Sequence, residues 1–212
     1  MNRRPRPPAR RKLGHTRRVV SFLAFFGAAL SWAAPLLAHE RHGTVAGLLA
    51  GLYHPVSGLD HVLAMIAVGL WGAQLGAPAL WLLPVTFPVV MAFGGALGLA
   101  GLGIPGVEIG IALSAVLLGA MVLGEVRPPP WVSAGLVGAL AIFHGHAHGT
   151  ELPQGESALL YSLGFVMATG ALHGAGIALG LVHRRPVGKS ALRAVGAAVA
   201  MAGLFFLWNA LR

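Results

Sequence analysis

Imidazole and carboxylate side chains gather in two short stretches of an otherwise apolar chain. These stretches are residues 54–61 (HPVSGLDH) and residues 143–151 (FHGHAHGTE). Hydrophobic residues make up 56% of the chain and charged residues only 10%. Ionisable groups are costly at membrane depth, so a cluster of them there indicates a functional site. Imidazole combined with carboxylate is a ligand set for divalent transition metals.

Helical spacing predicts how these donors are arranged. On a helix that ends near residue 151, His144, His148 and Glu151 form one stripe and His146 points away. A break at Gly149 would turn Glu151 off that stripe.

In the first stretch, Pro55 and Gly58 interrupt the helix and let His54 fold back over Asp60 and His61. Broken helices of this kind line cavities at transporter ion sites. Met65, one turn after His61, offers a thioether on the same side.

The chain has the composition of an all-α, polytopic membrane helix bundle. Its mean hydropathy is +0.76, and several apolar runs approach the ~20 residues that span a bilayer. We expect six transmembrane helices near residues 58–76, 80–101, 106–126, 131–147, 156–181 and 190–210. The stretch of residues 44–53 is too short to span a bilayer. We therefore expect it to form a short broken or re-entrant half-helix before the first span. Glycine pairs such as Gly94/Gly98, Gly170/Gly174 and Gly176/Gly180 predict close helix contacts.

The N-terminal segment has the pattern of a signal peptide. Residues 1–38 carry eight Lys and Arg and no acid, with an apolar run from 19 to 37 before the small residue Ala38. We therefore expect a signal peptide at 1–38, cleaved, and a six-helix membrane transport domain at 39–212. The rest of the chain carries seven basic and six acidic residues, so no nucleic-acid partner is predicted. The absence of cysteine excludes disulfides and thiolate metal sites.

Basic residues predict the orientation. If the mature N-terminus is periplasmic and six spans follow, the loops at Arg127 and at 183–189 are cytoplasmic, as the positive-inside rule requires. The same count puts Asp60, Glu108 and Glu151 on the outer side. The clustered donors would then share one face of the membrane.

Structural interpretations of the same residues remain open. Asp60 fits a capping box over residues 57–60, and Glu108 fits a carboxylate stabilised by a helix N-terminus. His173 is as well explained by packing as by ligation. His39 and His42 either gather metal outside the membrane or belong to a polar tail.

The motifs of the chain resemble those of the HupE/UreJ family of nickel transporters. The matching motifs are His54-Pro55-x-x-Gly58-x-Asp60-His61, Pro105-x-Val107-Glu108-x-x-Ile111-Ala112-x-Ser114, Phe143-His144-Gly145-x-Ala147-His148-Gly149-x-Glu151 and Ala168-Thr169-x-x-Leu172-His173.

The resemblance implies a six-span protein of the bacterial inner membrane, made with a signal peptide. It implies transport of Ni(II), or of Co(II), to metalloenzymes such as hydrogenase or urease. The functional positions that it implies are His54, Asp60, His61, Phe87, Glu108, His148 and Glu151. The extra imidazole of His146 is not a clear family feature and leaves the metal preference open.

The resulting hypothesis is a divalent-metal permease and not an enzyme, with no tightly bound cofactor. The ion would be held by His54, Asp60, His61, Glu108, His148 and Glu151, with His39, His42, Met65, His144, His146 and His173 as possible accessory groups. No Gly-x-x-x-x-Gly-Lys-Ser/Thr loop occurs, which argues against direct use of ATP.

Two other classes remain as alternatives. An intramembrane zinc-dependent hydrolase would use His144 and His148 with Asp60 and His61. A bis-histidine haem protein would need histidine pairs on facing helices, for which only His173 is well placed.

Overall fold

The computed structural model describes residues 44–151, 157–184 and 186–212, and every regular element in these ranges is helical. The all-α prediction is therefore confirmed for this part of the chain. The predicted signal peptide at 1–38 lies outside the described residues, as do His39 and His42.

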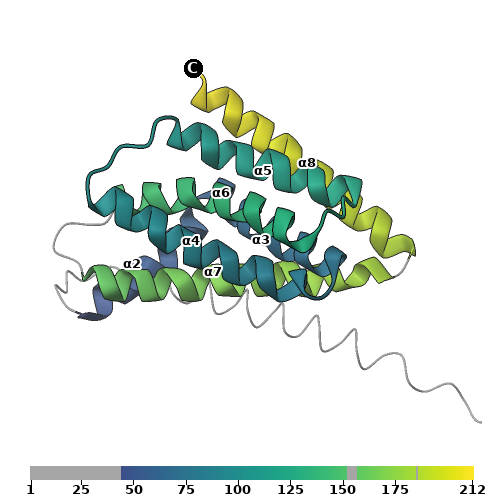
Figure 1. The fold of residues 1–212 in the computed structure, drawn as a ribbon, viewed down its shortest axis with the longest axis horizontal. Helices are drawn as coiled ribbons and strands as arrows, with labels where there is room; N and C mark the ends of the chain where they lie inside the picture. Colours follow the sequence, from purple (N-terminus) through teal and green to yellow (C-terminus); the bar gives the residue numbers. More distant parts are fainter. Residues whose placement is uncertain (1–43, 152–156, 185) are drawn as a thin grey trace, which may run out of the picture. The chain divides into compact units, whose positions relative to one another are not determined.

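The described elements follow one another without a long insertion (Figure 1). They are α2 (Thr44–Ser57), α3 (Leu59–Leu75), α4 (Ala79–Leu99), α5 (Val107–Gly124), α6 (Pro130–Thr150), α7 (Ala158–Gly180), the 3-10 helix η2 (Leu181–Arg184) and α8 (Pro186–Ala210). Helices α3 to α8 correspond to the six predicted helices, with ends that differ by at most four residues.

The largest difference lies at the start of α8. The predicted loop at 183–189 is mostly helical, because η2 continues α7 and α8 begins at Pro186. Proline suits the first position of a helix, because its fixed φ is favourable there and a backbone N–H at that position would have no partner within the helix.

Membrane-spanning character is clear for most of these helices. Within the described ranges, four segments are long and apolar enough to span, namely Ala79–Leu99, Val107–Gly124, Ala158–His183 and Pro186–Ala210. A fifth is counted if the bent pair of α2 and α3 forms one span. Helix α6 has 21 residues, but the histidines in its last two turns lower its apolar character. Large apolar side chains such as Leu159, Phe205 and Trp131 are exposed, which fits contact with lipid tails and a multi-pass membrane protein.

Helices α2 and α3 meet at a sharp break. The two axes are bent by 82°, and Gly58 between them has an extended backbone with φ −100° and ψ 117°. The broken segment was predicted, but its helix does not end at residue 53: it runs through Pro55 to Ser57. Proline in the last turn removes only one helical hydrogen bond, and the Ser57 hydroxyl donates to the free His54 carbonyl at 2.7 Å.

Glycines allow the helices to approach backbone to backbone. Helix α4 packs on α6, α5 on α8, and α7 on both α2 and α3; α5 and α8 run alongside each other in Figure 1. A Cβ added at Gly94 would overlap the Ile142 carbonyl of α6, and one at Gly176 would overlap the Ile66 carbonyl of α3. The predicted contacts at Gly94/Gly98 and Gly176/Gly180 are therefore confirmed.

The predicted contact at Gly170/Gly174 is wrong. Neither glycine would bring an added Cβ within 4 Å of another group. Gly170 and Gly176 are six residues apart, which places them about 120° from each other around the helix axis. They therefore lie on different faces of α7, and only Gly176 faces a neighbouring helix.

Helix α3 lies at the centre of the packed helices. Every residue from Ala64 to Gln74 except Ile66 is buried, as expected for a helix that is apolar on all sides. Near its C-terminal end, Trp71 Nε1 donates to the Val126 carbonyl at 2.9 Å and Gln74 Nε2 donates to the Val122 carbonyl at 3.1 Å. These bonds satisfy carbonyls at and just beyond the end of α5 and attach it to α3.

Candidate metal site

Four helix ends meet around one cavity of about 240 Å³. They are the C-terminal ends of α2 and α6 and the N-terminal ends of α3 and α5. The lining side chains are those of His54, Ser57, Asp60, His61, Glu108, Ile111, Ala147 and Glu151, with the backbone at Gly58. Five of the six predicted metal ligands are in this list, and His148 belongs to the neighbouring cluster.

His54, His148 and Glu151 form the tightest donor cluster of the described residues. One donor atom from each can be chosen so that all three lie within 4.8 Å of one another. His54 Nε2 is 3.2 Å from Glu151 Oε2. Exposure increases within the cluster, from the buried His148 through the half-buried His54 to the exposed Glu151. The cluster therefore extends from the protein interior to the exposed side of the cavity.

Asp60 and His61 form a second pair at the start of α3. Asp60 Oδ1 accepts hydrogen bonds from the His61 backbone N–H at 2.8 Å and lies 2.9 Å from His61 Nδ1. The Ser57 half of the capping box is absent, because Ser57 bonds to His54 and Gly58 is the N-cap residue without a side-chain bond. Asp60 does accept from an amide in the first turn of α3, as the structural interpretation expects. The same carboxylate also orients the His61 imidazole and leaves His61 Nε2 to face the interior.

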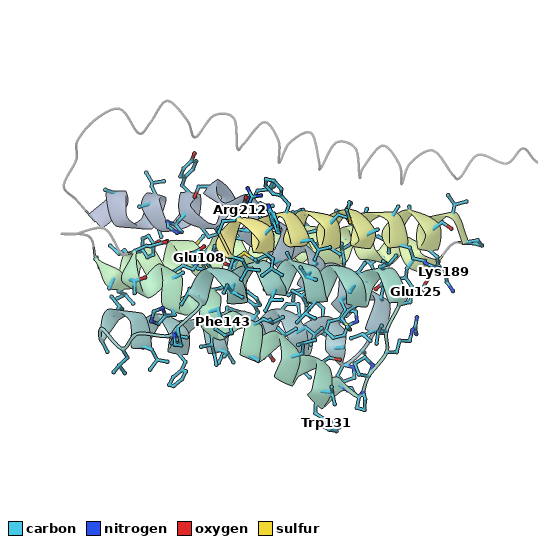
Figure 2. All side chains as sticks on the ribbon, turned by 90° about the horizontal axis from the view of Figure 1, so that it is seen from above. Glu108, Glu125, Trp131, Phe143, Lys189 and Arg212 are labelled. Atoms are coloured by element: carbon cyan, nitrogen blue, oxygen red, sulfur yellow. The ribbon has the colours of Figure 1, made fainter. Side chains whose placement is uncertain are left out.

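Glu108 lies in the first turn of α5, after Gly106 in the left-handed conformation with φ 70°. This turn brings the carboxylate to the cavity wall. In Figure 2, Glu108 lies toward one end of the helices, and Glu125 and Lys189 lie toward the other. The dipole and metal-ligand interpretations of Glu108 are compatible, because a helix N-terminus also stabilises a carboxylate that binds a cation.

Helix α6 presents its donors on one stripe, as predicted. The helix does not stop at 147 but continues to Thr150, and Gly149 does not break it. Glu151 is the C-cap residue and follows His148 on the side that faces His54. His146 points away from the cluster, and its Nε2 lies 2.7 Å from the Leu102 carbonyl in the α4–α5 connection.

Aromatic rings continue from the cluster toward the interior. The His148 ring is 4.7 Å from the rings of both His54 and His61, and the His61 ring is 4.7 Å from that of His144. Phe87 then contacts His144 at 5.4 Å and His173 at 5.3 Å between ring centroids. His144, Phe87 and His173 are almost completely buried, at 0%, 0% and 1% exposure.

Met65 does not join the cavity. It is fully buried in the apolar core, and it is not among the side chains that line the site. Its position one turn after His61 is on the side that packs inside the bundle.

Three further residues surround the donors and were not assigned to the site from the sequence, although Ser114 belongs to one of the matched motifs. The Phe165 ring lies 4.1 Å from that of His148, and the Tyr161 ring lies 5.8 Å from that of His54. Ser114 Oγ lies 2.7 Å from His144 Nε2. A hydroxyl in an apolar helix is itself a signal for a polar partner, and it was available at Ser114 and Tyr161.

Comparisons with known proteins agree on one family. The model of the family described as HupE / UreJ protein matches residues 27–206. The chain is also 48% identical over 176 residues to Protein HupE from Rhizobium leguminosarum bv. viciae, over 82% of this chain and 92% of that relative. No solved structure gave a match.

Proposed function

The chain belongs to the HupE/UreJ family, and we propose that it is a secondary transporter for a divalent transition metal. The substrate is Ni(II) or Co(II), taken up across the bacterial inner membrane. The metal would then reach the maturation of a metalloenzyme such as hydrogenase or urease. These substrates and partners are the ones that the motif resemblance implies.

The cluster of His54, His148 and Glu151 is the observation that carries the proposal. Imidazole nitrogen binds a first-row divalent ion at roughly 2 Å, so ligands on one ion lie about 3 to 4 Å apart. Donor atoms within 4.8 Å of one another need only a small movement to reach such an arrangement. Asp60, His61 and Glu108 extend the donor set around the same cavity.

Mixed nitrogen and oxygen donors suit transport better than permanent storage. A permeation site must bind the ion well enough to replace its water and weakly enough to release it. The exposed Glu151 and half-buried His54 would receive the hydrated ion, and the buried His148 would pass it inward. His173, beyond Phe87, would be a later station on this route.

We further propose that the cavity opens to the periplasm. In this topology α3 to α8 are six spans, residues 1–38 are a signal peptide and the mature N-terminus is periplasmic. Arg127 and Lys189 would then lie on the cytoplasmic side, in agreement with the positive-inside rule.

Uptake of radioactive nickel by cells that express the protein tests this function. Glu151→Gln and His61→Ala should each reduce 63Ni accumulation to the background of cells without the protein, at an unchanged amount of membrane protein. Glu125→Gln is the matched control, because it removes a carboxylate at the opposite end of the helices (Figure 2) and should keep wild-type uptake.

Wild-type accumulation in both cavity variants would overturn the proposal. Competition by unlabelled cobalt in the same assay identifies whether Co(II) shares the route.

A further inference from the structure

Ser114 determines which nitrogen of His144 is free. Its Oγ lies 2.6 Å from the Ile111 carbonyl and 2.7 Å from His144 Nε2, and both side chains are completely buried. A carbonyl oxygen can only accept, so the single hydroxyl hydrogen is donated to Ile111. The hydroxyl then has only lone pairs for His144, which must donate from Nε2–H. The lone pair of His144 is therefore on Nδ1.

His61 has the opposite arrangement. Its Nδ1 lies 2.9 Å from the Asp60 carboxylate and donates to it, so its lone pair is on Nε2. The rings of His61 and His144 are 4.7 Å apart and nearly perpendicular, at 85°. Among the described residues, His61 Nε2 and His144 Nδ1 are both buried without a hydrogen-bond partner. Such atoms are costly unless a ligand satisfies them.

His148 connects this inner pair with the outer cluster. Its ring contacts those of His54 and His61 at the same 4.7 Å separation. Both His148 nitrogens are buried and have no hydrogen-bond partner in the described part of the chain. On the inner side, the Phe87 ring covers His144 at 5.4 Å. The His61–His144 pair thus lies between the outer cluster and an aromatic side chain.

We infer that His61 Nε2 and His144 Nδ1 form a second, deeper station for the divalent metal ion, with Ser114 as its positioning residue. This inference rests on the proposed transport function. The ion leaves His54 and Glu151, remains bound to His148 and is taken over by the inner pair. Ser114 does not touch the ion; it keeps the His144 ring in the orientation and tautomer that present Nδ1. Loss of such a partner behind a metal ligand typically costs 10- to 100-fold in affinity or activity.

Saturation curves of 63Ni uptake separate the two stations, with rates normalised to the amount of protein in the membrane. Ser114→Ala should lower Vmax about 10-fold and leave KM unchanged, because the outer cluster that receives the ion is intact. Ser114→Thr keeps the hydroxyl and should restore most of the rate. His144→Gln keeps an N–H donor near the Nε2 position but has no lone pair at Nδ1, so it should lose at least as much Vmax.

The outcomes also distinguish the two proposals. Glu151→Gln acts on the outer cluster and should abolish uptake. If it does so while Ser114→Ala and His144→Gln keep wild-type Vmax, the deeper station is wrong and the transport function stands. If Glu151→Gln has no effect, the transport site itself is wrong.

A spectroscopic measurement on the wild-type protein covers the case in which these variants fail to fold. Nitrogen-15 NMR of histidine-labelled protein in detergent distinguishes protonated from unprotonated ring nitrogens. We expect metal-free signal sets from at least two histidines with protonated Nε2 and unprotonated Nδ1, because the Leu102 carbonyl holds His146 in the same tautomer as His144. The Nδ1 signal of one of them, assigned to His144, should change when Ni(II) is added, and that of His146 should not. Absence of that tautomer, or a His144 Nδ1 signal that does not respond to nickel, overturns the inference.

Discussion

The three histidines of α6 have different surroundings because of their positions around the helix axis. His144 and His148 are four residues apart and face α3, where they contact the ring of His61. His146 is two residues from each, about 200° around the axis, and bonds to the Leu102 carbonyl. One residue type therefore has a ligand arrangement at two positions and a structural bond at the third.

Substitution by glutamine tests this difference at the residue scale. His146→Gln keeps a donor for the Leu102 carbonyl and should retain wild-type 63Ni uptake. His148→Gln removes both ring nitrogens between His54 and His61. Uptake should fall at least 10-fold, because loss of a ligand should cost no less than loss of a partner behind a ligand. If both variants lose the same fraction of 63Ni uptake at equal amounts of membrane protein, the distinction between a ligand at His148 and a structural residue at His146 is wrong.

The site could be predicted from the sequence wherever helical spacing was sufficient. The stripe of His144, His148 and Glu151 and the divergence of His146 follow from the period of a helix. The contact of Ser114 with His144 joins residues 30 positions apart and depends on how α5 packs on α6. The hydrogen bond of Asp60 to the His61 ring could not be predicted from spacing, because the capping pattern does not reveal that Ser57 bonds backwards to His54.

At the scale of elements, close backbone contacts hold the donor-bearing helices in register. Helix α6 carries three of the histidines, and its position is set by its contact with α4. Gly94 and Gly98 of α4 face carbonyl groups of α6, and Gly145 of α6 faces the Met91 carbonyl of α4. Lipid tails supply no hydrophobic driving force between helices, so association depends on such close packing, on hydrogen bonds between helices and on lipid entropy. The small-xxx-small pattern predicted these contacts in α4, but it could not distinguish the packed face of α7 from its open face.

Alanine substitution tests the contact between α4 and α6. Gly94→Ala should destabilise the protein by about 1–3 kcal/mol, because the added methyl overlaps the Ile142 carbonyl. Gly170→Ala is the matched control: nothing lies within 4 Å of its added Cβ, and no loss is expected. The apparent Tm of purified protein in detergent measures both. An unchanged Tm for Gly94→Ala would contradict the predicted close approach.

At the scale of the whole chain, charge and helix direction predict one orientation. The helix ends that surround the cavity belong to α2, α3, α5 and α6, and the basic connections lie at the other end of these helices. Composition and length predicted the positions of the helices well. The number of spans stays a prediction: length and hydropathy alone indicate four spans among the described residues, or five with the bent pair of α2 and α3. Helix α6 carries site histidines that lower its hydropathy, and α3 is only 17 residues long.

Single cysteines test this orientation directly, because the chain has no cysteine of its own. Gly103→Cys lies in the α4–α5 connection and should react with a membrane-impermeant maleimide added to intact spheroplasts. Val126→Cys, just after α5, should react only after the membrane is opened. The reverse pattern would contradict a periplasmic cavity, and labelling of both residues in the sealed membrane would contradict the span between them.

The most direct test of the central claim is the X-ray absorption spectrum of nickel bound to the purified wild-type protein. We expect a shell of nitrogen and oxygen atoms only, with the outer-shell scattering of at least two imidazoles from the cluster of His54 and His148. No sulfur is expected, because the chain has no cysteine and Met65 lies in the apolar core. A spectrum without imidazole scattering, or with a nickel–sulfur shell, would contradict the account.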